Sequence, residues 1–185
     1  MKHILIAGGD KRNVYLANSL NSEGFTVKVI GFDKSVCFDK GIERITDAKV
    51  CAPGCVLAIF GIPASFDGIR LWTPMSFKEI YLSDITGNLP SDCILAGGRV
   101  NLCPQSFEGF DVTDYTTRCD FAYLNAVPTA EGAIEAVMKD SEKTLADSVC
   151  AVTGFGRCSE ILAQRLGAFG TEVHIYARSP KDLSQ

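Results

Sequence analysis

The stretch CAVTGFGRCSEILAQRLGAFGTEVHIYARS, Cys150–Ser179, decides the fold class of this chain. A short apolar run at Val149–Thr153 predicts a buried strand, and Gly154 supplies the tight turn that follows it. Apolar residues then recur at helical spacing until Gly170 ends the predicted helix. They are Cys158, Ile161, Leu162, Leu166 and Phe169. The last segment, Thr171–Ser179, predicts a second strand.

A strand, a glycine turn and a helix in this order are typical of a dinucleotide site. The free N–H groups and the dipole of such a helix face the pyrophosphate. Gly156 lets the backbone approach the phosphates, and Ser159 replaces the third glycine of the fingerprint with a small residue. The alternative is an ordinary turn that merely needs glycine. The predicted cofactor residues are Gly154, Phe155, Gly156, Arg157, Cys158, Ser159, Arg178 and Ser179.

The end of the second predicted strand favours NADP over NAD. NAD-binding domains place Asp or Glu there to bind the ribose 2′-hydroxyl, whereas a 2′-phosphate requires cationic or neutral donors. Here Ala177, Arg178 and Ser179 supply no carboxylate, and Arg157 adds a second guanidinium from the glycine loop. The alternative for Arg178 is an exposed charge at a strand end.

The first part of the chain alternates β-rich runs with helical patterns. This alternation predicts an α/β fold, a flavodoxin- or Rossmann-like parallel sheet with helices on both faces. The predicted strands are His3–Gly9, Phe25–Asp33, Val56–Pro63 and Cys93–Val100. Asp10 is the predicted N-cap of a helix whose apolar face contains Val14, Leu16, Ala17 and Leu20. One short helix is expected at Phe77–Leu82.

The turn after the first strand, GGDKRN at residues 8–13, has adjacent glycines and is a poor dinucleotide fingerprint. It suits a small carboxylate better, because backbone N–H groups at a helix start favour anions and Lys11 and Arg12 lie in the first turn. An ordinary strand-to-helix turn with solvated basic residues is an equal alternative. Gly9, Asp10 and Arg12 are therefore candidate substrate-binding residues.

The segment NAVPTAEGAIEAVMKDSEKTL, residues 125–145, predicts a helix with Pro128 in its first turn. We expect an N-terminal α/β domain at 1–120, a linker helix at 121–146 and a partial second Rossmann domain at 147–185. Asn125, Thr129 and Glu131 begin the linker helix in this interpretation, and we expect them to contact substrate in a cleft between the domains. Thr129 and Glu131 could equally be a hydrogen-bonded pair that starts the helix.

Composition and charge exclude several classes of protein. A net charge of −4 gives no basic surface for nucleic acid. No apolar run approaches the roughly 20 residues that span a bilayer, and MKHILIAGG has no cleavage site of a secretory signal, so we expect a cytoplasmic protein without a membrane partner.

Eight cysteines follow no paired metal-ligand spacing, although Cys51 and Cys55 lie close together, and we expect reduced core thiols and no metal. His3 and His174 both lie within predicted strands, where a packed or edge imidazole is the better interpretation. No catalytic acid or base is identified.

Three stretches together resemble the family of the dipicolinate synthase A subunit. They are IAGGDKRNVYLANSL with VIGFD, then NAVPTAEGAIEAVM, and then VTGFGRCSEILAQRLGAFGTEVHIYARS. The family shares the GGD-R turn, an N-x-x-PT-x-EG helix, a G-x-GR-x-G loop and an AR strand end. Ser159 departs from that pattern, because the family usually has glycine there. The resemblance covers most of the chain and is weakest between Ala64 and Pro90.

The resemblance implies an NADP-linked oxidoreductase that forms dipicolinate, the aromatic diacid of bacterial spores. Its substrate would be a cyclic dihydro- or hydroxytetrahydro-dipicolinate from the lysine pathway. The resemblance also implies a flavodoxin-like domain before a Rossmann domain. A flavoprotein-like B subunit is the partner that the resemblance implies, and we expect the chain to form a homo-oligomer. Family members are longer, so we expect an incomplete chain that is inactive alone.

Two other functions remain open. One is a non-catalytic module that binds a dicarboxylate or a partner protein. The other is a different NADP-dependent dehydrogenase of the 2-hydroxyacid or alanine dehydrogenase kind, which would share the fold but not the substrate.

Overall fold

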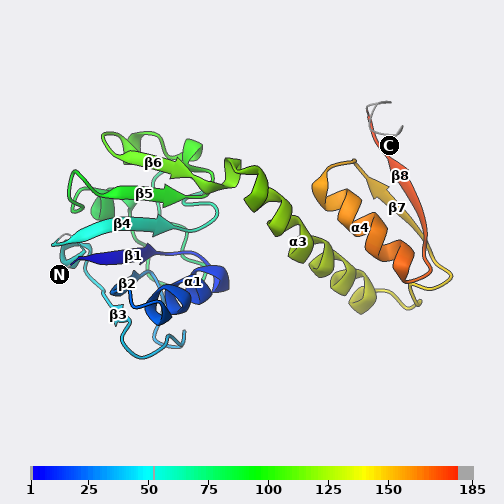
Figure 1. The fold of residues 1–185 in the computed structure, drawn as a ribbon, viewed down its shortest axis with the longest axis horizontal. Helices are drawn as coiled ribbons and strands as arrows, with labels where there is room; N and C mark the ends of the chain where they lie inside the picture. The colour runs from blue at the N-terminus through cyan, green and yellow to red at the C-terminus, as the bar shows by residue number, and fades with distance from the viewer. Residues whose placement is uncertain (1, 52, 179–185) are drawn as a thin grey trace. The chain divides into compact units, whose positions relative to one another are not determined.

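The computed structural model describes residues 2–51 and 53–178 and divides into two compact units. Unit 1 comprises residues 1–116, and unit 2 comprises residues 117–185. Figure 1 shows the order of the elements along the chain. The predicted boundaries of the two domains and the linker stay a prediction.

Unit 1 is built on one parallel sheet of six strands. The strands are β1 His3–Ala7, β2 Val27–Ile30, β3 Glu43–Arg44, β4 Cys55–Phe60, β5 Ile94–Gly97 and β6 Asp111–Asp114. Their order, β3-β2-β1-β4-β5-β6, is that of the doubly wound Rossmann sheet. Without the two-residue β3, the order is that of flavodoxin. The predicted α/β fold class is therefore confirmed.

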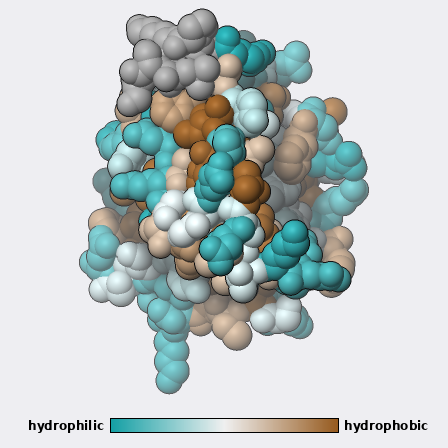
Figure 2. All heavy atoms as spheres, turned by 90° about the vertical axis from the view of Figure 1, so that its right-hand side faces the viewer, coloured by the Kyte–Doolittle hydropathy of each residue, from teal (hydrophilic) through white to brown (hydrophobic). Residues whose placement is uncertain are grey.

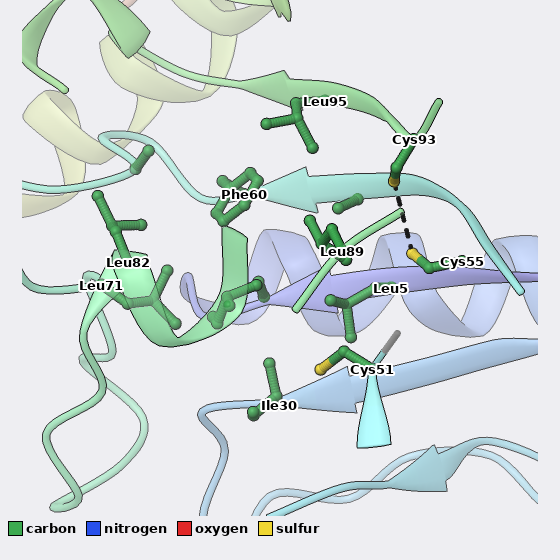
Figure 3. Packing of buried hydrophobic residues seen from close by; sticks show 14 of the residues in the cluster. Leu5, Ile30, Cys51, Cys55, Phe60, Leu71, Leu82, Leu89, Cys93 and Leu95 are labelled. Atoms are coloured by element: carbon green, nitrogen blue, oxygen red, sulfur yellow. Dashed lines mark hydrogen bonds between the residues drawn. The ribbon is translucent and has the colours of Figure 1, made fainter. Parts of the chain in front are cut away.

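Two apolar clusters cover the two faces of this sheet. Ile4 and Ile6 of β1 point to one face, where they pack with Ala17 of α1, Lys11–Ser22. Leu5 and Ala7 point to the other face and join the larger cluster, which includes Phe60 and the residues of α2, Leu82–Thr86 (Figure 3). This alternation follows from the period of two in a strand.

The start of α1 matches the prediction, but its core face differs. Asp10 is the N-cap, and its carboxylate accepts a hydrogen bond from the Arg12 N–H at 2.9 Å. Asn13 and Ala17 are the buried residues of this helix. Leu16 was expected in the core but is exposed, because it lies about 100° from Ala17 around the helix.

The helix expected at Phe77–Leu82 is wrong in position, since helix α2 begins only at Leu82. The backbone before it is held by contacts distant in sequence. The N–H of Phe77 donates to the Asp33 carboxylate at 3.2 Å, and that of Lys78 donates to the Ser76 hydroxyl at 3.1 Å. These bonds replace the helical ones. Short 3-10 turns complete the unit at Ala48–Val50, Val100–Leu102, Gln105–Phe107 and Tyr115–Thr117.

Four of the eight cysteines lie in the core of unit 1, namely Cys51, Cys55, Cys93 and Cys103. The Sγ atoms of Cys55 and Cys93 are 3.7 Å apart (Figure 3). Burial raises the pKa of Cys55 to about 12 and that of Cys51 to about 11. Within residues 2–51 and 53–178, no group of three or more His, Cys, Asp or Glu side chains is placed to hold a metal ion.

We expect the thiols of the native protein to form two classes that differ in their rate of reaction with iodoacetamide at pH 8. The thiolate is the nucleophile, so buried thiols with raised pKa should react only after denaturation. Exposed Cys37, Cys119 and Cys158 should be labelled first. Peptide mass spectrometry measures this order, and rapid labelling of Cys55 or Cys93 in the folded protein would contradict the packing.

Unit 2 contains two helices and a two-stranded parallel sheet. The elements are α3 Cys119–Asp140, β7 Val149–Thr153, α4 Arg157–Ala168 and β8 Glu172–Tyr176. One face of the sheet packs against both helices, where Val152 of β7 lies in one apolar cluster with Ile134 of α3 and Leu166 of α4. The opposite face leaves Val149 and Tyr176 exposed. Figure 2 shows that some hydrophobic residues, coloured brown, are open to solvent on the surface of the protein.

Helix α3 begins earlier than predicted. Its N-cap is Arg118, so Pro128 lies inside the helix and its placement in the first turn is wrong. Proline has no N–H to offer to the carbonyl four residues before it. The neighbouring Thr129 hydroxyl donates to the Asn125 carbonyl at 2.7 Å, one residue after the Leu124 carbonyl from which Pro128 withholds the helical donor. The helix ends at Asp140.

In the part of the chain that the structure describes, no helix has the length and the apolar character needed to cross a lipid bilayer.

Candidate functional site

The first candidate site lies at the carboxyl edge of the unit 1 sheet. Ligands of doubly wound sheets bind outside the carboxyl ends of the strands where the strand order reverses, here between β1 and β4. Gly9 follows β1, and Gly61 follows β4. A Cβ on Gly61 would lie 2.7 Å from the Cα of Gly9, so the two strand exits pack backbone against backbone. This contact fixes the start of α1 relative to β4.

Residues 71–77 cover the ends of β1 and β2. The Gly9 N–H donates to the Trp72 carbonyl at 2.9 Å, and the Asp33 N–H donates to the Met75 carbonyl at 2.9 Å. The Asp33 carboxylate stands after β2, where an NAD-binding domain would hold the ribose, but it accepts a 2.9 Å hydrogen bond from the Ser76 hydroxyl. The Asp33 carboxylate is thus already bonded within the chain, which agrees with the poor glycine fingerprint of unit 1.

Two candidate substrate residues, Asp10 and Arg12, form a forked ion pair. Arg12 Nε lies 3.0 Å from one Asp10 oxygen, and Nη2 lies 2.9 Å from the other. Partial burial alone would raise the pKa of Asp10, but the hydrogen bonds from Arg12 outweigh burial and lower it. The charge of Arg12 is therefore offset locally, and half of its side chain remains exposed.

A group of residues at the ends of β5 and β6 was not predicted from the sequence. Arg99 has a left-handed backbone, with φ of 55°, and its N–H faces the Asp114 carboxylate at 3.3 Å. The Tyr115 hydroxyl donates to the Phe60 carbonyl at 2.7 Å, and burial raises the pKa of Tyr115 although nearby Arg12 lowers it. The GGR sequence at residues 97–99, inside the strand predicted at Cys93–Val100, was the available signal, since glycines there permit close loop packing.

The second candidate site is the glycine loop of unit 2. Gly154 has φ of 94°, a conformation that favours glycine, and its N–H donates to the Tyr176 carbonyl at 2.7 Å. Gly156 is the N-cap of α4, and a Cβ built on it would meet no described atom within 4 Å. The first N–H groups of α4 have no partner within the helix. The loop thus combines open space with donors for an anion.

Two guanidiniums belong to unit 2 near this loop. Arg157 is the first residue of α4, and its Nη2 lies 3.7 Å from the Cys119 sulfur. Arg178 is exposed and follows β8, whose register pairs Tyr176 with Thr153. Arg178 and the glycine loop therefore leave the sheet at the same end. Predicted Ser179 lies outside the described residues. These residues fit the phosphates of a dinucleotide, because they supply donors and positive charge.

Asn125, Thr129 and Glu131 lie in the middle of α3, so the alternative of a helix-starting pair is wrong. The Thr129 hydroxyl donates a hydrogen bond to the Asn125 carbonyl, and Glu131 forms an ion pair with Arg165 of α4. These three residues belong to unit 2, whereas Gly9, Asp10 and Arg12 belong to unit 1. Their contact with substrate stays a prediction.

Comparison with known proteins gives one consistent result. A family model described as the N-terminal domain of the dipicolinate synthase A subunit matches residues 3–103. The dipicolinate synthase A subunit of Bacillus subtilis (strain 168) is 24% identical over 186 aligned positions, which cover 98% of this chain and 63% of that protein.

Two crystal structures share the fold. The dipicolinate synthase A subunit from Bacillus halodurans has a TM-score of 0.80 at 24% identity, covering 99% of this chain and 64% of that one. The A chain of dipicolinate synthase from Bacillus subtilis has a TM-score of 0.76 at 24% identity, covering 99% and 63%. The chain thus spans less than two thirds of the length of these relatives.

Proposed function

The chain belongs to the family of the N-terminal domain of the dipicolinate synthase A subunit, and from this premise we propose that it is part of an NADP-linked oxidoreductase that forms dipicolinate. The substrate in this proposal is a dihydro- or hydroxytetrahydro-dipicolinate, and the setting is sporulation. The match over residues 3–103 carries the proposal, because it covers the unit that holds the candidate carboxylate site.

The two units divide the work in this proposal. Unit 1 binds the cyclic dicarboxylate at the carboxyl edge of its sheet, where Gly9, Asp10 and Arg12 start α1. Unit 2 binds NADP at its glycine loop. When bound, NADP⁺ would accept a hydride from the ring while a proton passes to solvent, which makes a dihydro ring aromatic; a hydroxytetrahydro ring would also lose one water molecule. The contribution of the protein is to orient the two rings and to offset the charge of two carboxylates.

Two further parts of the proposal concern the setting of the protein. We propose a cytoplasmic homo-oligomer that works with a flavoprotein-like B subunit. Co-purification of tagged chain with the B subunit from a sporulating culture tests the partner, and light scattering of the purified chain tests the oligomer.

Arg178 tests the choice of cofactor. If its guanidinium binds the 2′-phosphate, Arg178→Ala should weaken NADPH binding roughly tenfold or more and leave NADH binding unchanged, since one charge-assisted hydrogen bond contributes about 1.5–3 kcal/mol. Titration of NADPH and NADH fluorescence with the full chain measures both affinities. Lys143→Ala, which also removes an exposed charge of unit 2, is the control.

An equal loss of both cofactors in Arg178→Ala would contradict the NADP assignment. If the unaltered chain bound pyridine-2,6-dicarboxylate but neither cofactor, a dicarboxylate-binding module would be the better description.

A further inference from the structure

We propose that Arg99 is the main carboxylate anchor of unit 1, and that Arg12 holds the second carboxylate of the same ligand. This inference rests on the proposed function, because that function supplies the class of ligand, a ring dicarboxylate. Arg99 is not among the residues predicted from sequence.

The backbone of Arg99 is held firmly in a conformation that few side chains adopt. Its φ of 55° and ψ of 43° are left-handed. The Asp114 carboxylate accepts from the N–H groups of Arg99 at 3.3 Å and of Val100 at 3.1 Å. The preceding Gly98 donates its N–H to the Gly61 carbonyl at 3.1 Å. Strain of this kind persists where the surroundings fix it, and it occurs often at ligand sites.

The guanidinium of Arg99 has no ion-pair partner among the described residues. Its side chain is exposed, and no carboxylate lies within ion-pair distance of it in residues 2–51 and 53–178. Asp114, the acid nearest in the contacts described, is occupied by backbone N–H groups and by Thr116. Arg12, by contrast, is neutralised by Asp10. The uncompensated guanidinium is therefore the stronger attraction for a carboxylate.

Arg99 and Arg12 flank the same short segment. The N–H of Arg99 faces the Thr116 hydroxyl at 3.4 Å, and Arg12 interacts electrostatically with the adjacent Tyr115. Both arginines follow strands at the carboxyl edge, β5 and β1, which lie on either side of β4. Neighbouring strands are about 4.8 Å apart, so β1 and β5 are roughly 10 Å apart, a span that two arginine side chains can close around one ring. Guanidiniums also bind carboxylates in a forked geometry that lysine cannot match.

The experiment measures binding of pyridine-2,6-dicarboxylate and of pyridine-2-carboxylate to the full chain by calorimetry. Arg99→Gly removes the guanidinium while relaxing the left-handed backbone, so the fold is retained. Arg99→Gln removes the same charge and keeps a side chain. Lys49→Gln, which removes an exposed charge from the segment between β3 and β4, is the matched control for lost charge.

We expect both Arg99 variants to bind the dicarboxylate at least roughly tenfold more weakly, and to bind it about as weakly as the monocarboxylate. Lys49→Gln should bind the dicarboxylate as tightly as the unaltered chain does. The NADPH affinity of every variant should be unchanged. Dicarboxylate affinity that survives in folded Arg99→Gly but falls in Arg12→Ala would overturn the role of Arg99 and leave the proposed function standing. No binding of the dicarboxylate to the unaltered chain would overturn both.

Discussion

Gly156→Asp should reduce NADPH affinity by roughly a hundredfold or more while leaving unit 2 at least as stable as before. The affinity falls because the new carboxylate stands at the N-cap of α4, where the cofactor phosphates are proposed to bind, and like charges so placed cost several kcal/mol. Stability does not fall because the site is open and the backbone is extended, with φ of −117°. Asp is a good N-cap, better than Gly by a few tenths of a kcal/mol.

Cofactor fluorescence and thermal unfolding followed by circular dichroism measure these two effects. Gly156→Asn is the matched control, since it has nearly the same shape and capping ability without the charge. It should retain more NADPH binding than Gly156→Asp. If both variants bound NADPH as the unaltered chain does, the glycine loop would not be the cofactor site.

Gly61→Ala is expected to lower the free energy of unfolding of unit 1 by about 2–3 kcal/mol, although it adds one methyl group. The new Cβ would lie 2.7 Å from the Cα of Gly9, and backbone atoms cannot rotate away as a side chain can. Relief requires β4 to separate from the start of α1. Dicarboxylate binding should therefore weaken as well, because Arg12 stands in that first turn.

Urea unfolding followed by tryptophan fluorescence measures this change, because Trp72 is the one tryptophan of the chain and packs close to Gly61. Gly132→Ala is the same chemical change in the middle of α3, where a Cβ meets no described atom within 4 Å. It should stabilise unit 2 by about 1 kcal/mol through helix propensity. Equal effects from the two substitutions would show that the close contact of Gly61 and Gly9 is not important.

The strands that sequence reasoning found are those with continuous apolar runs. β1, β2 and most of β4 and β5 are buried, and their composition reflects this, although Val56 of β4 and Ile94 of β5 are exposed. β6 was missed because it lies at the sheet edge, where Asp111 and Asp114 interrupt an apolar pattern. The early start of α3 was missed because Pro128 resembles a helix start, whereas in the structure it lies inside the helix.

The candidate sites differ in the same way. The glycine loop at Gly154–Ser159 is local, so a strand, a turn and a helix in sequence order were enough to predict its backbone. Arg99 depends on Asp114 and on Gly61, both distant in sequence, so its fixed backbone and its unpaired charge emerge only after folding. Asp10 and Arg12 are only two residues apart, but the forked ion pair that offsets the charge of Arg12 was not predicted and is seen only in the structure.

The central claim is that the two units bind two different ligands, and amide NMR of the full isotope-labelled chain tests it most directly. Pyridine-2,6-dicarboxylate should shift the amide signals at Gly8–Arg12 and Gly98–Thr116, and NADPH should shift those at Thr153–Glu160 and Ala177–Arg178. Each ligand should leave the signals of the other site in place. If the dicarboxylate shifted only signals of unit 2, or NADPH only signals of unit 1, the proposed division of function would be contradicted.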